Sequence, residues 1–223
     1  MAPTYPPLPS RDDLPELIRA ALANAKDLLN DAQLLADAGR FPRSLALATL
    51  SWEELSKADL CAMAMVLPEV TPDYFWEHFR DHEGKLARVY AFAAFIQPKP
   101  IGSVGDWAER VKALSKSTQD LKERSLYVDY RRGKILLPSQ VTEKAARKQI
   151  KAVREALDFA DRAFSGESVG IMFTQVNTIA GPLKNSMVID PDATAAALQE
   201  AIRDGSQEKI QSLVNEHATI TDD

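Results

Sequence analysis

Two clusters of ionisable residues near the middle of the sequence have residue types and spacings suited to acid–base chemistry. The first is Glu53, Glu54 and Lys57, which lie in an Ala- and Leu-rich stretch. On a helical period both carboxylates share faces with apolar residues. Buried charge is costly unless it is paired and hydrogen-bonded, so the cluster predicts either a structural ion pair or chemistry. The structural alternative is a Glu53–Lys57 pair at i,i+4 that also ties down a neighbouring helix.

The second cluster runs from Glu77 to Lys85 and contains His78 and His82. Histidines four residues apart lie on one helix face, which is a metal-binding spacing, and Glu53 or Glu54 could add ligands. A second Glu-x-x-His is missing, however, so we expect no metal or other cofactor, with the metal site kept as an alternative. Our preferred interpretation is a core-facing His82 bonded to one of these carboxylates, which fixes its tautomer and raises its basicity.

A third polar segment covers residues 122–134 and combines basic and aromatic side chains. Lys122, Arg124 and Asp129 belong to its helical part. The residues that could contact RNA phosphates or stack on unpaired bases are Lys122, Tyr127, Tyr130, Arg131, Arg132 and Lys134. The alternative is ordinary helix termination, because cations favour a helix C-terminus and a Gly-containing turn follows.

The charge distribution supports an RNA contact in this region. The chain has 223 residues and a formal net charge of −5, which alone predicts no nucleic-acid partner. Residues 110–154, however, contain 13 Lys and Arg against 4 Asp and Glu. The sequence lacks a Gly-rich phosphate loop, a Cys pair for zinc and a Gly-x-Ser-x-Gly turn, which disfavours nucleotide hydrolases and serine hydrolases.

The elements that must position these residues are helices. Apolar periodicity predicts an all-α helical bundle of about five main helices with a C-terminal appendage of short helices. The expected helices cover residues 13–38, 42–66, 73–96, 106–127 and 139–164, followed by short ones at 191–203 and 206–217. The fourth helix is expected to bury Trp107, Val111, Leu114, Leu121 and Val128.

Three regions follow from this pattern. Residues 1–10 hold four prolines and are expected to be a disordered leader, residues 11–166 the bundle, and residues 167–223 a loop and short helices packed on it. The single cysteine, Cys61, indicates a reducing compartment. Because no signal peptide or membrane-length apolar run is present, we expect a cytoplasmic protein without a membrane partner.

Three segments together resemble the AbiV family of abortive-infection proteins, which are bacterial antiphage factors. They are Ser44–Lys57, Phe79–Lys85 and Lys122–Asp129. Ser56 departs from the family pattern, which usually has Gly before the lysine. The resemblance extends to the HEPN-like helical group, many of whose members cleave or bind RNA, and it implies a homodimer.

The HEPN-like nucleases carry an Arg followed after four to six residues by His. Here the nearest equivalent is Arg124-x4-Asp129, so the motif is not intact and a ribonuclease activity stays open. We expect an antiphage protein that acts on RNA or translation through a polar pocket in the bundle. Its site would comprise Glu53, Glu54, Lys57, His82, Lys85, Arg124 and Asp129. The alternative is a non-catalytic helical module that binds a phage or host protein and uses these clusters as struts.

Overall fold

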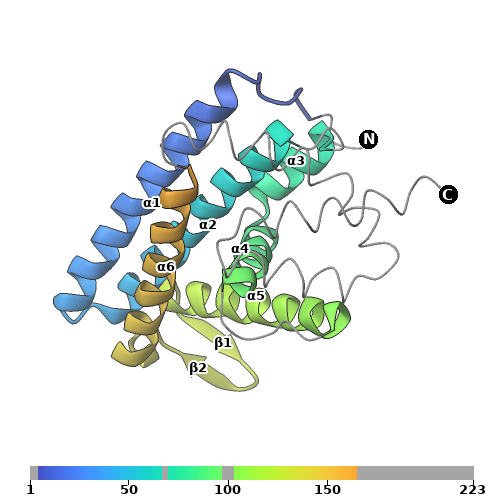
Figure 1. Ribbon diagram of the computed structural model, residues 1–223. Helices are drawn as coiled ribbons and strands as arrows, with labels where there is room; N and C mark the ends of the chain where they lie inside the picture. Colours follow the sequence, from blue (N-terminus) through green and yellow to red (C-terminus); the bar gives the residue numbers. More distant parts are fainter. Residues whose placement is uncertain (1–4, 67–69, 97–102, 165–223) are drawn as a thin grey trace.

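The computed structural model describes residues 5–66, 70–96 and 103–164, and these form an all-α bundle (Figure 1). The helices are α1 (Asp13–Asp37), α2 (Phe41–Val66), α3 (Pro72–Arg80), α4 (His82–Ile96), α5 (Val104–Leu126) and α6 (Glu143–Phe164). A small antiparallel hairpin, β1 (Asp129–Arg131) and β2 (Lys134–Leu136), follows α5, and a 3-10 turn, η1 (Pro138–Gln140), leads into α6. The predicted fold class is confirmed. The short helices expected at 191–203 and 206–217 lie outside the described residues.

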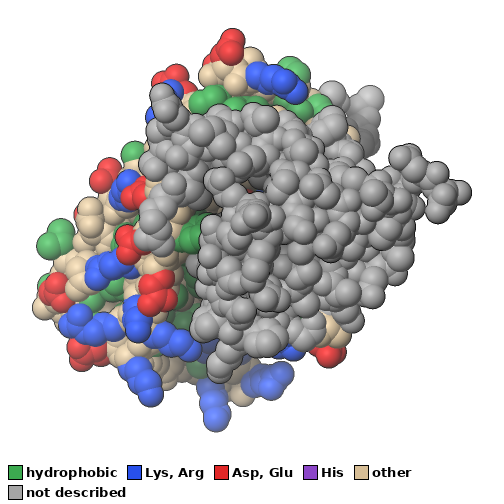
Figure 2. Space-filling view, in the orientation of Figure 1, with side chains coloured by type: hydrophobic (Ala, Val, Ile, Leu, Met, Phe, Trp, Pro, Cys, Tyr) green, Lys and Arg blue, Asp and Glu red, His purple; other side chains and the backbone are tan. Residues whose placement is uncertain are grey.

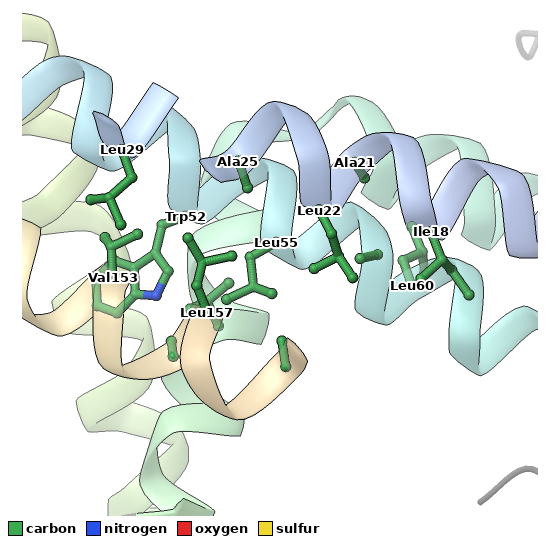
Figure 3. Close-up of a cluster of buried hydrophobic side chains, with 14 of the residues drawn as sticks. Ile18, Ala21, Leu22, Ala25, Leu29, Trp52, Leu55, Leu60, Val153 and Leu157 are labelled. Carbon is green, nitrogen blue, oxygen red and sulfur yellow. The ribbon is translucent and has the colours of Figure 1, made fainter. Parts of the chain in front are cut away.

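Helix α2 is the centre of the bundle. It contacts every other helix of the described part, and α1 and α6 pack along it (Figure 1). Helix α1 presents a stripe of buried apolar residues to α2, with the small residues Ala25 and Ala32 fully buried. Small residues let the two helix backbones approach closely. In Figure 3, Leu29 of α1, Trp52 of α2 and Val153 and Leu157 of α6 meet in this core.

Helix α5 is attached to the bundle by a polar face. Its buried residues are Ser115, Thr118, Lys122 and Ser125, which recur at three- and four-residue intervals. The apolar stripe expected for this helix is wrong at Leu114, which is 47% exposed, and at Val128, which is 67% exposed and lies beyond the end of α5, whereas Leu121 is partly buried against core residues. Tyr90 of α4 contacts this face through a 2.5 Å hydrogen bond between its hydroxyl and that of Thr118. The polar face therefore delivers a lysine into the interior.

The single helix expected over residues 73–96 is two helices, which corrects the sequence prediction. Asp81 has extended backbone angles (φ −72°, ψ 117°) and separates α3 from α4. Its carboxylate accepts hydrogen bonds from the backbone N–H groups of Glu83 (3.1 Å) and Gly84 (2.9 Å), so it caps α4. A Cβ on residue 84 would lie 2.5 Å from Asp81 Oδ2, which explains the glycine. The break makes His82 the first residue of α4.

The hairpin turn is built from Arg132 and Gly133, both in the left-handed region (φ 50° and 77°). Two consecutive positive φ values match the tight hairpin turns whose twist suits antiparallel strands. Tyr130 pairs with Ile135 across the ladder. In Figure 1 the hairpin projects from the end of the bundle where α5 finishes and α6 begins. None of the described helices is long and apolar enough to cross a membrane.

Candidate functional site

The site is centred on Glu53, whose carboxylate is only 2% exposed in the middle of α2. Oε2 lies 2.5 Å from His82 Nδ1 and 3.3 Å from Lys85 Nζ, and Oε1 lies 2.6 Å from Lys122 Nζ. Three helices, α2, α4 and α5, therefore contribute to one ionic group. We call these four residues the Glu53 cluster.

His82 is the part of the cluster that reaches the surface, with its side chain 53% exposed. Its position at the start of α4 follows from the Asp81 cap, which fixes the direction in which the new helix leaves the break. The Nδ1–H group donates to Glu53, so in the neutral ring Nε2 is left as an acceptor. The expected bond between His82 and a carboxylate is present, and the carboxylate is that of Glu53. The expectation of a core-facing ring is wrong, because the side chain is half exposed.

The two lysines of the cluster are buried, Lys85 at 4% and Lys122 at 5% exposure. Burial alone raises the pKa of Glu53, but hydrogen bonds from Lys122 and His82 and the charges of both lysines outweigh it, so the pKa lies below its ordinary value. Glu53 is therefore a carboxylate at neutral pH. One negative charge between two ammonium groups leaves a net positive charge directly behind the imidazole.

Glu54 and Lys57 form a separate ion pair on the same helix. Lys57 Nζ lies 2.5 Å from Glu54 Oε1, and both side chains are about one fifth exposed, at 22% and 18%. The Glu53–Lys57 pair offered as the structural alternative is therefore wrong: Lys57 binds the adjacent carboxylate. Lys57 also lies 5.2 Å from the centre of the Phe79 ring, which connects α2 to α3.

His78 does not join His82. Its Nδ1 lies 2.8 Å from the carbonyl oxygen of Tyr74 within α3, and its ring stacks on that of Tyr74. Because the break at Asp81 puts the two histidines on different helices, the i,i+4 metal spacing read from the sequence does not exist. Among the described residues, no three His, Cys, Asp or Glu side chains are grouped so that they could hold a metal ion.

Comparison with known families identifies the family of the chain. A family model named HEPN_AbiV, described as AbiV, matches residues 13–158, which include all three segments that resemble the family. The chain belongs to the AbiV family. The match covers α1 to α5 and most of α6. Membership of this family indicates a role in abortive-infection defence. No curated protein and no solved structure matches the chain.

In this AbiV protein, Arg124 and Asp129 are the nearest equivalent of the HEPN-like Arg and His motif. Among the contacts of the described residues, neither of them binds a member of the Glu53 cluster. Arg124 Nε donates to the carbonyl oxygen of Asp120, one turn earlier in α5. Asp129 accepts hydrogen bonds from the Arg131 side chain and from the backbone N–H of Tyr130. The expected site residues thus separate into the Glu53 cluster, the Glu54–Lys57 pair, Arg124 in the last turn of α5 and Asp129 at the start of the hairpin.

The hairpin of the AbiV chain is exposed and combines cations with large apolar side chains. Arg131, Arg132 and Lys134 are exposed. Its exposed apolar and aromatic residues are Tyr127 (65%), Val128 (67%), Tyr130 (70%), Ile135 (62%) and Leu137 (44%). Figure 2 shows Lys and Arg side chains at the lower edge of this face, the end of the bundle where the hairpin lies.

Two residues that shape the site were missed by the sequence analysis, Asp81 and Gly84. An acidic residue followed by the first turn of a new helix is a recognisable N-cap pattern. Because the helical periodicity is continuous across residues 73–96, it predicts a single helix and the N-cap pattern was not recognised. Lys122 was found but expected to contact RNA, whereas it is buried against Glu53. Its three- to four-residue spacing from Thr118 and Ser125, which are small, is a signal of a buried face.

Proposed function

We propose that this AbiV protein acts on RNA and that His82 is its acid–base group. The observation that carries the proposal is the buried Glu53 carboxylate holding a half-exposed imidazole at 2.5 Å. A carboxylate bonded to Nδ1 fixes the tautomer and the orientation of the ring, so that Nε2 is the atom that can accept a proton. An interior strut needs none of its members to face solvent, whereas an acid–base group does.

The reaction that these groups suit is RNA transesterification. His82 Nε2 takes the proton from a ribose 2′-hydroxyl, and the 2′-oxygen then attacks the adjacent phosphorus to form a 2′,3′-cyclic phosphate. The bond from phosphorus to the 5′-oxygen breaks, and that oxygen takes a proton from an imidazolium. Since attack and departure occur on opposite sides of the phosphorus, His82 of a second copy in a homodimer is the natural donor.

The charges around the imidazole favour a phosphate substrate. Lys85 and Lys122 together outweigh Glu53, so the interior behind His82 is positive and stabilises the added charge on a phosphorane. Lys57, Lys85 and Arg124 are the cations among the expected site residues. Lys85 lies on the same helix as His82 and suits this role. Its buried ammonium stabilises the charge on the phosphorane through its electric field, without direct contact.

The hairpin supplies the RNA-binding surface of the proposal. Arg132 and Lys134 are exposed and can bind phosphates, whereas Arg131 is exposed but already paired with Asp129 and Asp120. The rings of Tyr127 and Tyr130 are exposed enough to stack on unpaired bases. Lys122 is assigned to the Glu53 cluster and not to RNA contact. Binding through this surface would weaken steeply with salt, because phosphate contacts release counterions.

A second candidate function is favoured by the apolar residues of the same hairpin. Val128, Ile135 and Leu137 have no role in phosphate binding, and exposed apolar patches mark protein interaction sites. In this alternative the chain is a non-catalytic module for a phage or host protein, and the Glu53 cluster is a strut.

Cleavage of labelled single-stranded RNA by the purified protein tests the proposal. The wild type and the His78→Ala control are expected to yield 2′,3′-cyclic phosphate ends, and His82→Ala is expected to lose at least about 100-fold in rate, the usual contribution of general acid–base catalysis. EDTA is included to inhibit contaminating nucleases that require a metal ion. Equal cleavage by His82→Ala and the wild type, or no cleavage by either, would contradict the catalytic assignment.

A further inference from the structure

The end of the proline-rich leader is seated on helix α3. The indole N–H of Trp76 donates to the carbonyl oxygens of Pro6 (2.8 Å) and Pro7 (3.2 Å). The guanidinium of Arg80 lies 5.6 Å from the centres of both the Tyr5 and Trp76 rings. These contacts join segments about 70 residues apart in sequence and are not explained by the Glu53 cluster.

Residues 5–9, Tyr-Pro-Pro-Leu-Pro, have the burial pattern of a polyproline II helix lying on a surface. Tyr5 and Leu8 are partly buried, as is Pro9, while Pro6 and Pro7 between them are exposed. A polyproline II helix has three residues per turn, so residues 5 and 8 lie on the same side. Leu8 reaches the main core, where it packs against buried apolar residues.

The surface beneath this segment has the chemistry that proteins use to bind polyproline. Trp76, Phe79 and Arg80, which we call the Trp76 face, offer aromatic rings, one indole donor and a cation. Proline-rich ligands dock in aromatic grooves, where they lose little conformational entropy because the polyproline II helix is already formed. The donor is well matched, since prolines have no N–H and leave their carbonyl oxygens free.

We propose that the Trp76 face is a binding site for a proline-rich segment of a partner protein and that residues 5–9 occupy this site in the free chain. The resident segment defines the ligand: an aromatic residue, two prolines whose carbonyls meet the indole, and a leucine three residues after the aromatic one. The proposal goes beyond the RNA-directed function and does not depend on catalysis by His82.

The tethered leader competes with any partner for the Trp76 face. A short flexible tether gives an effective concentration on the order of 1 mM. For a leader segment whose own Kd for the open face is about 100 μM, this concentration weakens the binding of any partner peptide about tenfold. Releasing the leader, or offering a partner with several such segments, removes that disadvantage.

Peptide binding to full-length protein tests the proposal. The probe is a fluorescent peptide with the sequence of residues 3–10, and the receptor is the variant Tyr5→Ala/Leu8→Ala, whose leader has lost both anchors. We expect measurable binding to this variant and about tenfold weaker binding to the wild type. Adding Trp76→Phe, which keeps an aromatic ring but removes the donor, should weaken binding at least about fivefold. A probe with both prolines changed to alanine is the matched ligand control.

Two results would overturn the proposal. One is absence of binding to a leader variant whose circular dichroism and melting temperature show that it is folded, and the other is binding unaffected by Trp76→Phe or by loss of the two prolines. If the leader variant is not folded, the indole N–H signal of Trp76 in the wild type, identified by its absence in Trp76→Phe, should shift at millimolar probe, and a fixed signal overturns the proposal. Concentration-dependent self-association of the wild type that Trp76→Phe abolishes would assign the face to the leader of a second copy and overturn the partner assignment.

Discussion

Replacing Glu53 with Gln should destabilise the protein strongly. The change keeps the size of the side chain but removes the only carboxylate that the described contacts give to Lys85 and Lys122. Both lysine residues are at most 5% exposed, so water cannot replace the carboxylate as their partner. Removing one partner of a buried ion pair costs about 3–5 kcal/mol, and the amide still accepts one hydrogen bond, so we expect a loss of about 3 kcal/mol in the free energy of unfolding.

Thermal unfolding measures this effect directly. For a chain of about this size 1 kcal/mol corresponds to about 2–4 °C, so the melting temperature should fall by about 6–12 °C. Glu54→Gln is the matched control: its carboxylate pairs with the partly exposed Lys57, so the loss should be at most about 1 kcal/mol.

A compensating variant separates charge from packing. Glu53→Gln combined with Lys122→Met removes one positive charge along with the negative one and should recover part of the lost stability. If Glu53→Gln and Glu54→Gln melt within about 2 °C of each other, the reasoning about the Glu53 cluster is refuted.

Three further predictions concern pH, capping and thiol reactivity. Because the pKa of Glu53 is lowered in the folded state, its contribution to stability is present above the unfolded carboxyl pKa of about 4.3 and is lost as the pH falls through the lower folded value. Urea midpoints measured from pH 7 to pH 3 should therefore fall more for the wild type than for Glu53→Gln, and parallel curves would contradict this. Gly84→Ala places a Cβ 2.5 Å from Asp81 Oδ2, so it should lower the free energy of unfolding by about 1–2 kcal/mol, as the loss of a cap does, and should add little to Asp81→Ala in a double-variant cycle. Burial raises the pKa of the Cys61 thiol to about 12, so iodoacetamide at pH 8 should label it only after unfolding, and rapid labelling of the folded protein would show that the α2 core opens.

Most of the helices follow from the sequence because their apolar residues recur at helical spacing. Helix α1 ends at Asp37, one residue before the predicted end at residue 38, and Gly39 follows in the left-handed conformation. The break at Asp81 was missed because Phe75, Phe79 and Leu86 keep the same helical period on either side of it. Periodicity reports which face is buried and not whether the backbone is continuous, and here a side-chain cap decides the second question.

The site was predictable in part. The pairing of Glu53 with His82 follows from the cost of burying a carboxylate, which makes a partner on another helix necessary. That Lys122 is a second partner of Glu53 could not be predicted in this way. Lys122 lies on the polar face of α5, and a prediction from hydrophobicity alone places such a face in solvent. The placement of Arg124 and Asp129 outside the Glu53 cluster depends on where α5 ends, and helix ends are the least certain part of a sequence prediction.

The most direct test of the acid–base role of His82 is the restriction of phage by cells expressing His82→Ala, measured beside the melting temperature of the same variant. A phage that the wild type restricts is used, and His78→Ala serves as the control. Because the imidazole is half exposed and Glu53 keeps both lysines, we predict that His82→Ala loses restriction while its melting temperature stays within about 3 °C of the wild type. Full restriction by His82→Ala, or loss of restriction only in proportion to loss of stability, would contradict the assignment and favour the strut.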